Sequence, residues 1–191
     1  MSELVTLLVT SVLINNVILN QFLGMCPFMG VSKKKSSALG MGVAVVFVIV
    51  VAALVTYALY YLVLVPIGLE FMELITFILV IASLVQLTEM FIKKYSPSLY
   101  KSLGVYLPLI TTNCVVLNVC LVNITNAYDF PHMLVYSIGT PLGFALVLYI
   151  FSTIRERLEL SNVPTAFKGN GIALICAAIM SMAFSGLAGI V

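Results

Sequence analysis

The sequence predicts an all-α integral membrane protein with six transmembrane helices, on two observations. Of its 191 residues, 62% are hydrophobic and 8% are charged, whereas an average soluble domain is about 25% charged. The apolar residues also gather in runs near the ~20 residues that a helix needs to cross a bilayer. These runs cover residues 3–24, 38–65, 70–92, 103–122, 133–154 and 170–190.

The basic residues predict how these runs are oriented. All nine follow the first, third or fifth run, and none lies at either chain end, at Pro66 or at Asp129. Cytoplasmic loops carry the excess of Lys and Arg, so we expect both termini to lie outside the cytoplasm. This placement favours a topological role in a lipid bilayer and no nucleic acid partner. The nine are Lys33, Lys34, Lys35, Lys93, Lys94, Lys101, Arg155, Arg157 and Lys168.

The first run is predicted to be a retained but interrupted helix. It has no basic segment before it and no small-residue cleavage site after a short apolar core, so it does not read as a signal peptide. Polar side chains at membrane depth are costly and usually face the bundle interior. Gly and Pro free backbone groups that lipid cannot satisfy but a protein-lined cavity can. The residues concerned are Asn15, Asn16, Asn20, Gln21, Gly24 and Pro27.

The second and third runs are predicted to be continuous helices joined by a turn at Pro66. Glu89 and Lys93 stand four residues apart on the third, which favours an ion pair.

The fourth run resembles the first in its polar content and is predicted to be interrupted as well. Its polar residues and proline are Pro108, Thr111, Thr112, Asn113 and Asn118.

The fifth run ends in charged residues that predict a solvated helix end, with docking of a cytoplasmic partner as the alternative. These residues are Arg155, Glu156, Arg157 and Glu159. The sixth run is rich in Ala and Ile.

The six runs predict one membrane domain, 1–191, built from two repeats of about 1–100 and 101–191. Each half has three runs, an odd number, so the second half must be inverted relative to the first. Residues 22–27 can be aligned with 110–115, and 39–42 with 138–141. Interrupted helices at matching places in two halves indicate a central site. Hydrogen bonding between helices by Asn and Thr is the alternative explanation for each polar residue.

Cys26 and Cys114 are the candidate ligands of a redox site. A lone Cys in an apolar helix usually packs as a small hydrophobe, and we expect this of Cys176. Cys120 follows Cys114 by six residues, about 120° round a helix, so the two cannot easily share a ligand set. Cys26 and Cys114 differ because each lies at the interruption of its run. Two thiolates are too few for an iron–sulfur cluster, so a second, pseudo-symmetric chain would have to supply two more.

A cluster at Cys26 also requires the first run to be broken or displaced. In a straight helix over 3–24, Cys26 would lie at the cytoplasmic end, whereas Cys114 falls near the middle of its run. The backbone after Gly24, together with Thr112 and Asn113, is a candidate for hydrogen bonds to the cluster sulfurs.

Several stretches resemble the RnfA family, whose members are membrane subunits of Rnf complexes. The most specific are LGMCPFMGVSKK at 23–34 and LPLITTNC at 107–114, supported by Asn15–Asn16, FILVIA at 77–82, IRERL at 154–158 and Val163–Pro164. The resemblance covers nearly the whole chain. The NqrE family, from the Na⁺-translocating NADH:quinone reductase, is a sister family that matches less well.

The resemblance implies a subunit of a bacterial cytoplasmic-membrane complex that moves electrons between ferredoxin and NAD⁺ and translocates Na⁺ or H⁺. It implies a [2Fe–2S] cluster within the membrane, with Cys26 and Cys114 as this chain's two ligands. The other two would come from RnfE, a homologous membrane protein of opposite orientation. Other subunits would carry the flavins and further clusters. This chain shows no flavin-attachment stretch and no complete active site of its own.

Two other classes of function stay open from the residues. The chain could be a small secondary transporter that binds a solute at Asn15, Asn113 and the broken helices. It could instead be a scaffold subunit whose cysteines only pack.

Overall fold

The computed structural model describes residues 2–32, 35–68, 70–95, 109–110, 113–161, 164 and 167–188. Within these ranges the regular elements are all helices, so the predicted all-α class is confirmed for the part of the chain described. Three helices there are long and apolar enough to cross a membrane, namely Lys35–Ile67, Glu73–Met90 and Phe130–Leu158. They correspond to the second, third and fifth predicted runs.

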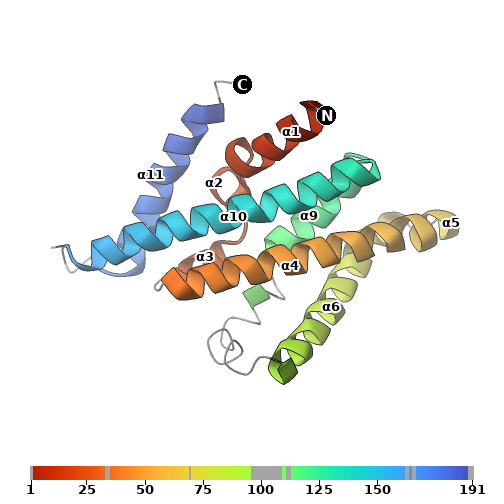
Figure 1. Cartoon of the computed structure of the whole chain (residues 1–191), viewed down its shortest axis with the longest axis horizontal. Coiled ribbons are helices and arrows are strands. Elements are labelled where there is room, and N and C mark those ends of the chain that lie inside the picture. Colours follow the sequence, from red (N-terminus) through yellow and green to blue (C-terminus); the bar gives the residue numbers. More distant parts are fainter. Residues whose placement is uncertain are drawn as a thin grey trace.

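Two long helices form the centre of the molecule. Helix α4 (Lys35–Leu59) and helix α10 (Phe130–Glu159) lie side by side and run in opposite directions (Figure 1). They approach closely at Gly42, where an added Cβ would lie 2.9 Å from Ala145 Cβ. Small residues at such a crossing let two helix backbones come together.

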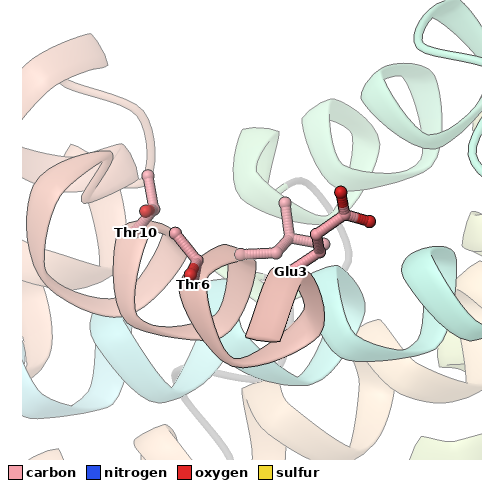
Figure 2. A pocket seen from close by; sticks show the side chains of 4 residues that line it. Glu3, Thr6 and Thr10 are labelled. Carbon is pink, nitrogen blue, oxygen red and sulfur yellow. The ribbon is translucent and has the colours of Figure 1, made fainter. Parts of the chain in front are cut away.

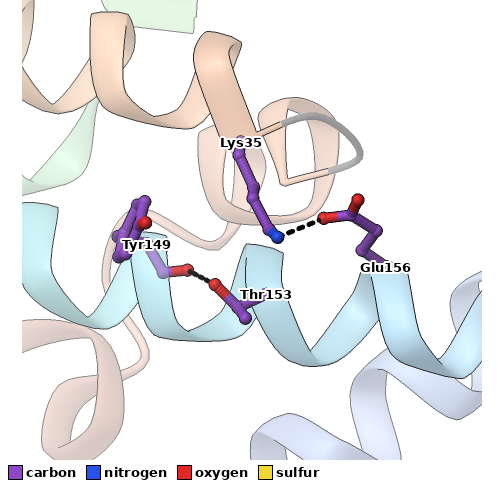
Figure 3. A network of polar contacts seen from close by, with 4 residues as sticks. All are labelled: Lys35, Tyr149, Thr153 and Glu156. Atoms are coloured by element: carbon purple, nitrogen blue, oxygen red, sulfur yellow. Dashed lines mark hydrogen bonds and ion pairs between the residues drawn. The ribbon is translucent and has the colours of Figure 1, made fainter.

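Contacts near both ends of this pair show its antiparallel register. At one end Lys35 Nζ lies 2.8 Å from Glu156 Oε2 (Figure 3). Toward the other end the Tyr57 hydroxyl donates to the Tyr128 carbonyl oxygen over 3.4 Å. The second and fifth predicted runs therefore point in opposite directions, which an inverted repeat requires of equivalent helices.

Helix α4 continues through a π-helical turn, η2 (Tyr60–Leu64), into α5 (Val65–Ile67), and ends at Gly68. Gly68 takes a left-handed φ of 71°, as the residue that ends a helix commonly does. After the short 3₁₀ turn η3 (Glu70–Met72), helix α6 spans Glu73–Tyr95.

The first run is broken twice, as a role for Cys26 in a membrane site requires. Its segments are α1 (Ser2–Val9), the π-helical η1 (Thr10–Ile14), α2 (Val17–Gln21) and α3 (Met25–Val31). Non-helical backbone is tolerated at membrane depth only where protein or a polar cavity covers it. The interruption predicted from the Asn, Gly and Pro content is thus present.

The fourth run is represented by α9 (Cys114–Thr125), and the sixth by α11 (Asn170–Ala188). Residues 103–108 and 111–112 lie outside the described part of the chain. Helix α9 packs against α4 and α6, whereas the segments of the first run pack against α10 and α11. Helices α6 and α11 lie on opposite sides of the central pair (Figure 1). The first and fourth runs therefore have neighbours that correspond between the halves.

A continuous apolar core joins the broken segments to the central pair. Phe28 of α3 stacks on Phe151 of α10, with ring centroids 4.1 Å apart. Val115, Val116 and Val119 of α9 are fully buried in the same core. The short helices are therefore held by tertiary packing, which a seven-residue helix needs because its own hydrogen bonds do not stabilise it.

The prediction of a solvated end for the fifth run is wrong at Arg155. Glu156 and Arg157 are exposed, but Arg155 is only 5% exposed and is hydrogen-bonded to other segments. The sequence pattern places three charges together, yet consecutive helical positions are about 100° apart and point in different directions. One of them therefore turns into the protein.

Candidate functional site

The first break, after η1, is closed by the side chain of Asn16. Its backbone is extended (φ −66°, ψ 119°), and its Oδ1 accepts the backbone N–H of Ile18 over 3.2 Å. Its Nδ2 donates to the Val12 carbonyl oxygen over 3.2 Å. Asn20 Nδ2 spans the same break to the Ile14 carbonyl oxygen at 2.6 Å. Asparagine is a favoured N-cap because it satisfies backbone groups that the helix leaves free.

The second break, between α2 and α3, rests on two left-handed residues. Phe22 has φ 54° and Gly24 has φ 76°. Glycine adopts this conformation without the steric cost that a Cβ adds. Gly24 is the N-cap of α3, so Cys26 is the second residue of that helix, and its side chain is exposed.

Helix α9 begins in the same manner as α2. Asn113 is its N-cap, with extended backbone (φ −73°, ψ 113°), and its Oδ1 accepts the Val115 N–H over 3.1 Å. Cys114 is the first residue of α9 and is exposed. Both candidate cysteines therefore lie in the first turn of a helix that starts at an interruption.

The two interruptions meet at Gly24. A Cβ placed on Gly24 would lie 2.8 Å from Phe144 Cε2, 2.8 Å from Val115 Cγ2 and 3.4 Å from Asn113 Oδ1. Distances under 3 Å are too short for a real Cβ contact, so only glycine fits here without movement. The residue before α3 is thus packed against the start of α9, although some ninety positions separate them in the sequence.

Asn113 also carries an unused hydrogen-bond donor. The residue is 4% exposed, and its Nδ2 has no partner among the described residues. Asn118 Nδ2, one turn farther along α9, is also buried without a described partner. Buried donors are nearly always paired, so both amide donors are available to acceptors outside the described residues. Of the three residues predicted to surround the cysteines, Gly24 and Asn113 lie together, and Thr112 falls outside the described residues.

The remaining two cysteines lie in or against the apolar core, as predicted for Cys176. Cys120 is 1% exposed and belongs to the apolar core, whereas Cys114 on the same helix is exposed. Cys176 of α11 is half-buried against that core. Among the residues described, no group of three or more His, Cys, Asp or Glu side chains could hold a metal ion. A metal centre at Cys26 and Cys114 would therefore need ligands from outside this part of the chain.

Helix α10 supports the first break through two glycines whose pairing was not predicted. A Cβ on Gly143 would lie 2.6 Å from the Val12 carbonyl oxygen and 3.0 Å from Asn16 Nδ2. A Cβ placed on Gly139, one turn earlier, would likewise lie too close to the side chain of Ser11. The Gly-x-x-x-Gly spacing is the signal that could have indicated this close helix contact.

The expectation that the polar residues of the first run face the bundle interior holds only for Asn16. Asn15, Asn20 and Gln21 are exposed on the surface of the single chain. Helix α2 has fewer than two turns, so it cannot turn all of its polar side chains inward.

A depression of about 370 Å³ lies along the first helix, lined by Glu3, Thr6, Leu7 and Thr10. Figure 2 shows the labelled side chains along one side of this helix. Its described lining includes neither Cys26 nor Cys114, so it is separate from the candidate site.

The family match and the individual relatives of this chain agree on one family. Residues 4–191 match the family described as "Rnf-Nqr subunit, membrane protein". The RnfA protein of the ion-translocating oxidoreductase complex of Hahella chejuensis is 52% identical over 191 residues, 100% of this chain and 99% of that protein. Its counterpart in the Na⁺-translocating ferredoxin:NAD⁺ oxidoreductase complex of Acetobacterium woodii is 52% identical over 186 residues, 97% of each chain. The Vibrio cholerae counterpart is 50% identical over 191 residues, 100% of this chain and 99% of that protein. The chain belongs to the Rnf-Nqr family of membrane-protein subunits.

Proposed function

We propose that this chain is the RnfA component of an ion-translocating ferredoxin:NAD⁺ oxidoreductase complex and supplies two ligands to an iron–sulfur cluster within the membrane. The relatives named above are subunits of ion-translocating oxidoreductase complexes, and one of those complexes is named as translocating Na⁺ and acting on ferredoxin and NAD⁺. Identity of about half over the full length supports carrying this role to the present chain.

The observation that carries the cluster proposal is the contact between the two helix interruptions. Gly24 packs against Asn113, and each interruption is followed within two residues by an exposed cysteine, Cys26 or Cys114. Thiols that only packed the core would be buried, as Cys120 is. Two exposed thiols on touching breaks supply half of the four-thiolate set of a [2Fe–2S] cluster.

The surroundings of the cysteines fit such a group. The unpaired Nδ2 of Asn113 is a donor next to Cys114, and sulfur atoms of a cluster accept hydrogen bonds of this kind. The partial positive charge at the start of the twelve-residue helix α9 also favours a negatively charged group. When bound, the cluster would accept and release one electron at a time between redox partners on the two membrane faces.

The two ligands that this chain does not supply support a homologous subunit as the partner. A homologous subunit of opposite orientation would present two cysteines on breaks of its own, so the cluster would lie between the two chains. The exposed Asn15, Asn20 and Gln21 then belong to a surface that the partner covers, since polar side chains facing lipid are unfavourable. The one-sided distribution of Lys and Arg supports an outside location for both termini in the cytoplasmic membrane of a bacterium.

Electron transfer and ion movement are proposed to be coupled through charge. An electron added inside a low-dielectric region changes the local potential strongly. Two inverted repeats packed together at the breaks would form an element that such a change could bias between two arrangements.

The test uses membrane vesicles that contain the complete complex. Cys26→Ser and Cys114→Ser should each abolish ferredoxin-to-NAD⁺ electron transfer and the ion uptake driven by it, and Cys176→Ser should preserve both. Electron transfer that survives both substitutions would contradict the ligand role. Ion uptake that continues unchanged while electron transfer stops would contradict the coupling. Uptake of a solute by the chain alone would favour a transporter instead.

A further inference from the structure

A group of buried polar side chains lies between α9 and α10, apart from the two candidate cysteines. Asn123 of α9 and Ser137 and Thr140 of α10 are each no more than 2% exposed. Asn123 Nδ2 donates to Ser137 Oγ over 2.9 Å. Ser137 lies about 10 Å along the axis of α10 from its start at Phe130. The group is therefore set inside a helix that is long and apolar enough to span a membrane.

A hydrogen bond between two helices does not account for all of these polar atoms. It uses the amide N–H of Asn123, but Asn123 Oδ1 is buried without a hydrogen-bond partner among the described residues. Thr140 Oγ1 is likewise buried without one, although the hydroxyl of Tyr136 lies close to it. Lipid cannot satisfy such atoms. Both oxygens are therefore available to a group outside the described residues.

Thr140 also differs from other threonines on the long helices. A helical threonine can donate its hydroxyl to the carbonyl oxygen four residues earlier. Four threonines in the described helices α4, α6, α9 and α10 do so, namely Thr56, Thr88, Thr125 and Thr153. Thr140 does not make this bond. Its hydroxyl oxygen is therefore not committed to the backbone of its own helix.

Pro141 adds a backbone oxygen to the group. It lies inside α10 and has no N–H, so the usual helical hydrogen bond to the Ser137 carbonyl oxygen cannot form. Residues three apart on a helix are neighbours, so Thr140 stands beside Ser137. In transporters, carbonyl oxygens freed from helical hydrogen bonds coordinate Na⁺ within the membrane. The four oxygens collected here are Asn123 Oδ1, Ser137 Oγ, the Ser137 carbonyl oxygen and Thr140 Oγ1.

We propose that these four oxygens form a binding site for Na⁺ on an ion path through this chain. The amide oxygen of Asn123 and the carbonyl oxygen of Ser137 carry no hydrogen to donate, and oxygens of this kind replace the hydration shell of a cation inside a membrane. The inference rests on the proposed function in taking the complex to move a cation, and it adds where this chain would hold that cation.

The distance of this site from Cys114 allows the two to interact through charge. Asn123 follows Cys114 by nine residues on α9, about 13.5 Å along the helix axis. An electron added to a cluster at Cys114 would attract a cation over this distance in a low-dielectric interior. Na⁺ should therefore bind more tightly when the cluster is reduced than when it is oxidised.

The test is the binding of radioactive Na⁺ to the intact purified complex, with choline chloride keeping the ionic strength constant. Asn123→Ala and Thr140→Val should each raise the half-saturating Na⁺ concentration of one site about tenfold or more, because each removes a contact between a polar group and a charge. Thr125→Val, at an exposed threonine of α9, is the matched control and should leave the binding curve unchanged.

Pro141→Ala separates the cation site from the packing of the side chains. Alanine supplies an N–H that can pair with the Ser137 carbonyl oxygen, so one ligand is lost while the helix is favoured. Na⁺ binding should weaken as in the other two variants, but the thermal midpoint of the complex should not fall. An unchanged binding curve in all three variants overturns the site, as it would if these oxygens held only a water molecule.

The EPR signal of the cluster, recorded on the same samples, separates this inference from the proposed function. A complex that shows a signal dependent on Cys114 but binds no Na⁺, or binds it equally well in all three variants, contradicts the cation site alone. A signal unaffected by Cys114→Ser contradicts the proposed cluster. Weaker Na⁺ binding in the three variants would support the cation site in either case.

Discussion

Gly24 packs against the side chain of Asn113, so the two interrupted runs touch at the residues that start α3 and α9. A Cβ at Gly24 would lie 3.4 Å from Asn113 Oδ1 and only 2.8 Å from Val115 Cγ2. This contact connects two helix starts that each carry an exposed cysteine. The relative position of Cys26 and Cys114 thus depends on the absence of a side chain at one residue.

Gly24→Ala is expected to push α3 away from α9. The added methyl group would overlap Val115 and Phe144, and overpacking of this kind costs about 1–3 kcal/mol. Gly68→Ala is the matched control, because its φ of +71° is equally strained but nothing lies within 4 Å of its Cβ. Both substitutions should lower the midpoint temperature of thermal unfolding of the detergent-solubilised complex, and Gly24→Ala should lower it more. Equal effects would show that the contact with α9 is unimportant.

Asn113 is expected to have two separable roles, as the cap of α9 and as a donor to the site. Asn113→Ser keeps a capping oxygen but removes the amide donor, whereas Asn113→Ala removes both and should cost a further ~1 kcal/mol of stability. If a cluster sulfur accepts from Nδ2, both variants should lower the reduction potential by a similar amount. A normal potential in Asn113→Ser would exclude the donor role and leave only the cap.

Gly143→Ala is expected to displace the first break from α10. A Cβ added at Gly143 would lie 2.6 Å from the Val12 carbonyl oxygen. Gly186, on α11, is the matched control, because a Cβ added there has nothing within 4 Å. Limited proteolysis of the complex near residues 14–24 should accelerate in Gly143→Ala and stay at its normal rate in Gly186→Ala. The same rate in both variants would contradict a supporting role for this glycine.

The ion pair between Lys35 and Glu156 is expected to matter little. The two side chains are 46% and 54% exposed, and exposed pairs contribute about 0–1 kcal/mol. Lys35→Met should therefore leave assembly and the thermal midpoint of the complex nearly unchanged. A large loss of assembled complex would indicate that this end of α4 binds another protein of the complex.

The sequence predicted the long helices well, because α4, α6 and α10 are long apolar runs whose length and composition alone indicate spans. It also predicted the interruption of the first run, since Asn, Gly and Pro at membrane depth leave few alternatives. It could not predict that Gly24 meets Asn113, because a contact between distant segments depends on how the helices pack. For the same reason the burial of Arg155, among charges that resemble a solvated helix end, was missed.

The most direct test of the shared cluster is the EPR spectrum and iron content of the intact complex in three single variants. Cys26→Ser and Cys114→Ser should each remove the same [2Fe–2S] signal and its iron, while Cys176→Ser should leave both unchanged. Neither substitution should unfold this chain, because the side chains of Cys26 and Cys114 are exposed on it. A full signal in either of the first two variants would contradict a cluster held by both cysteines.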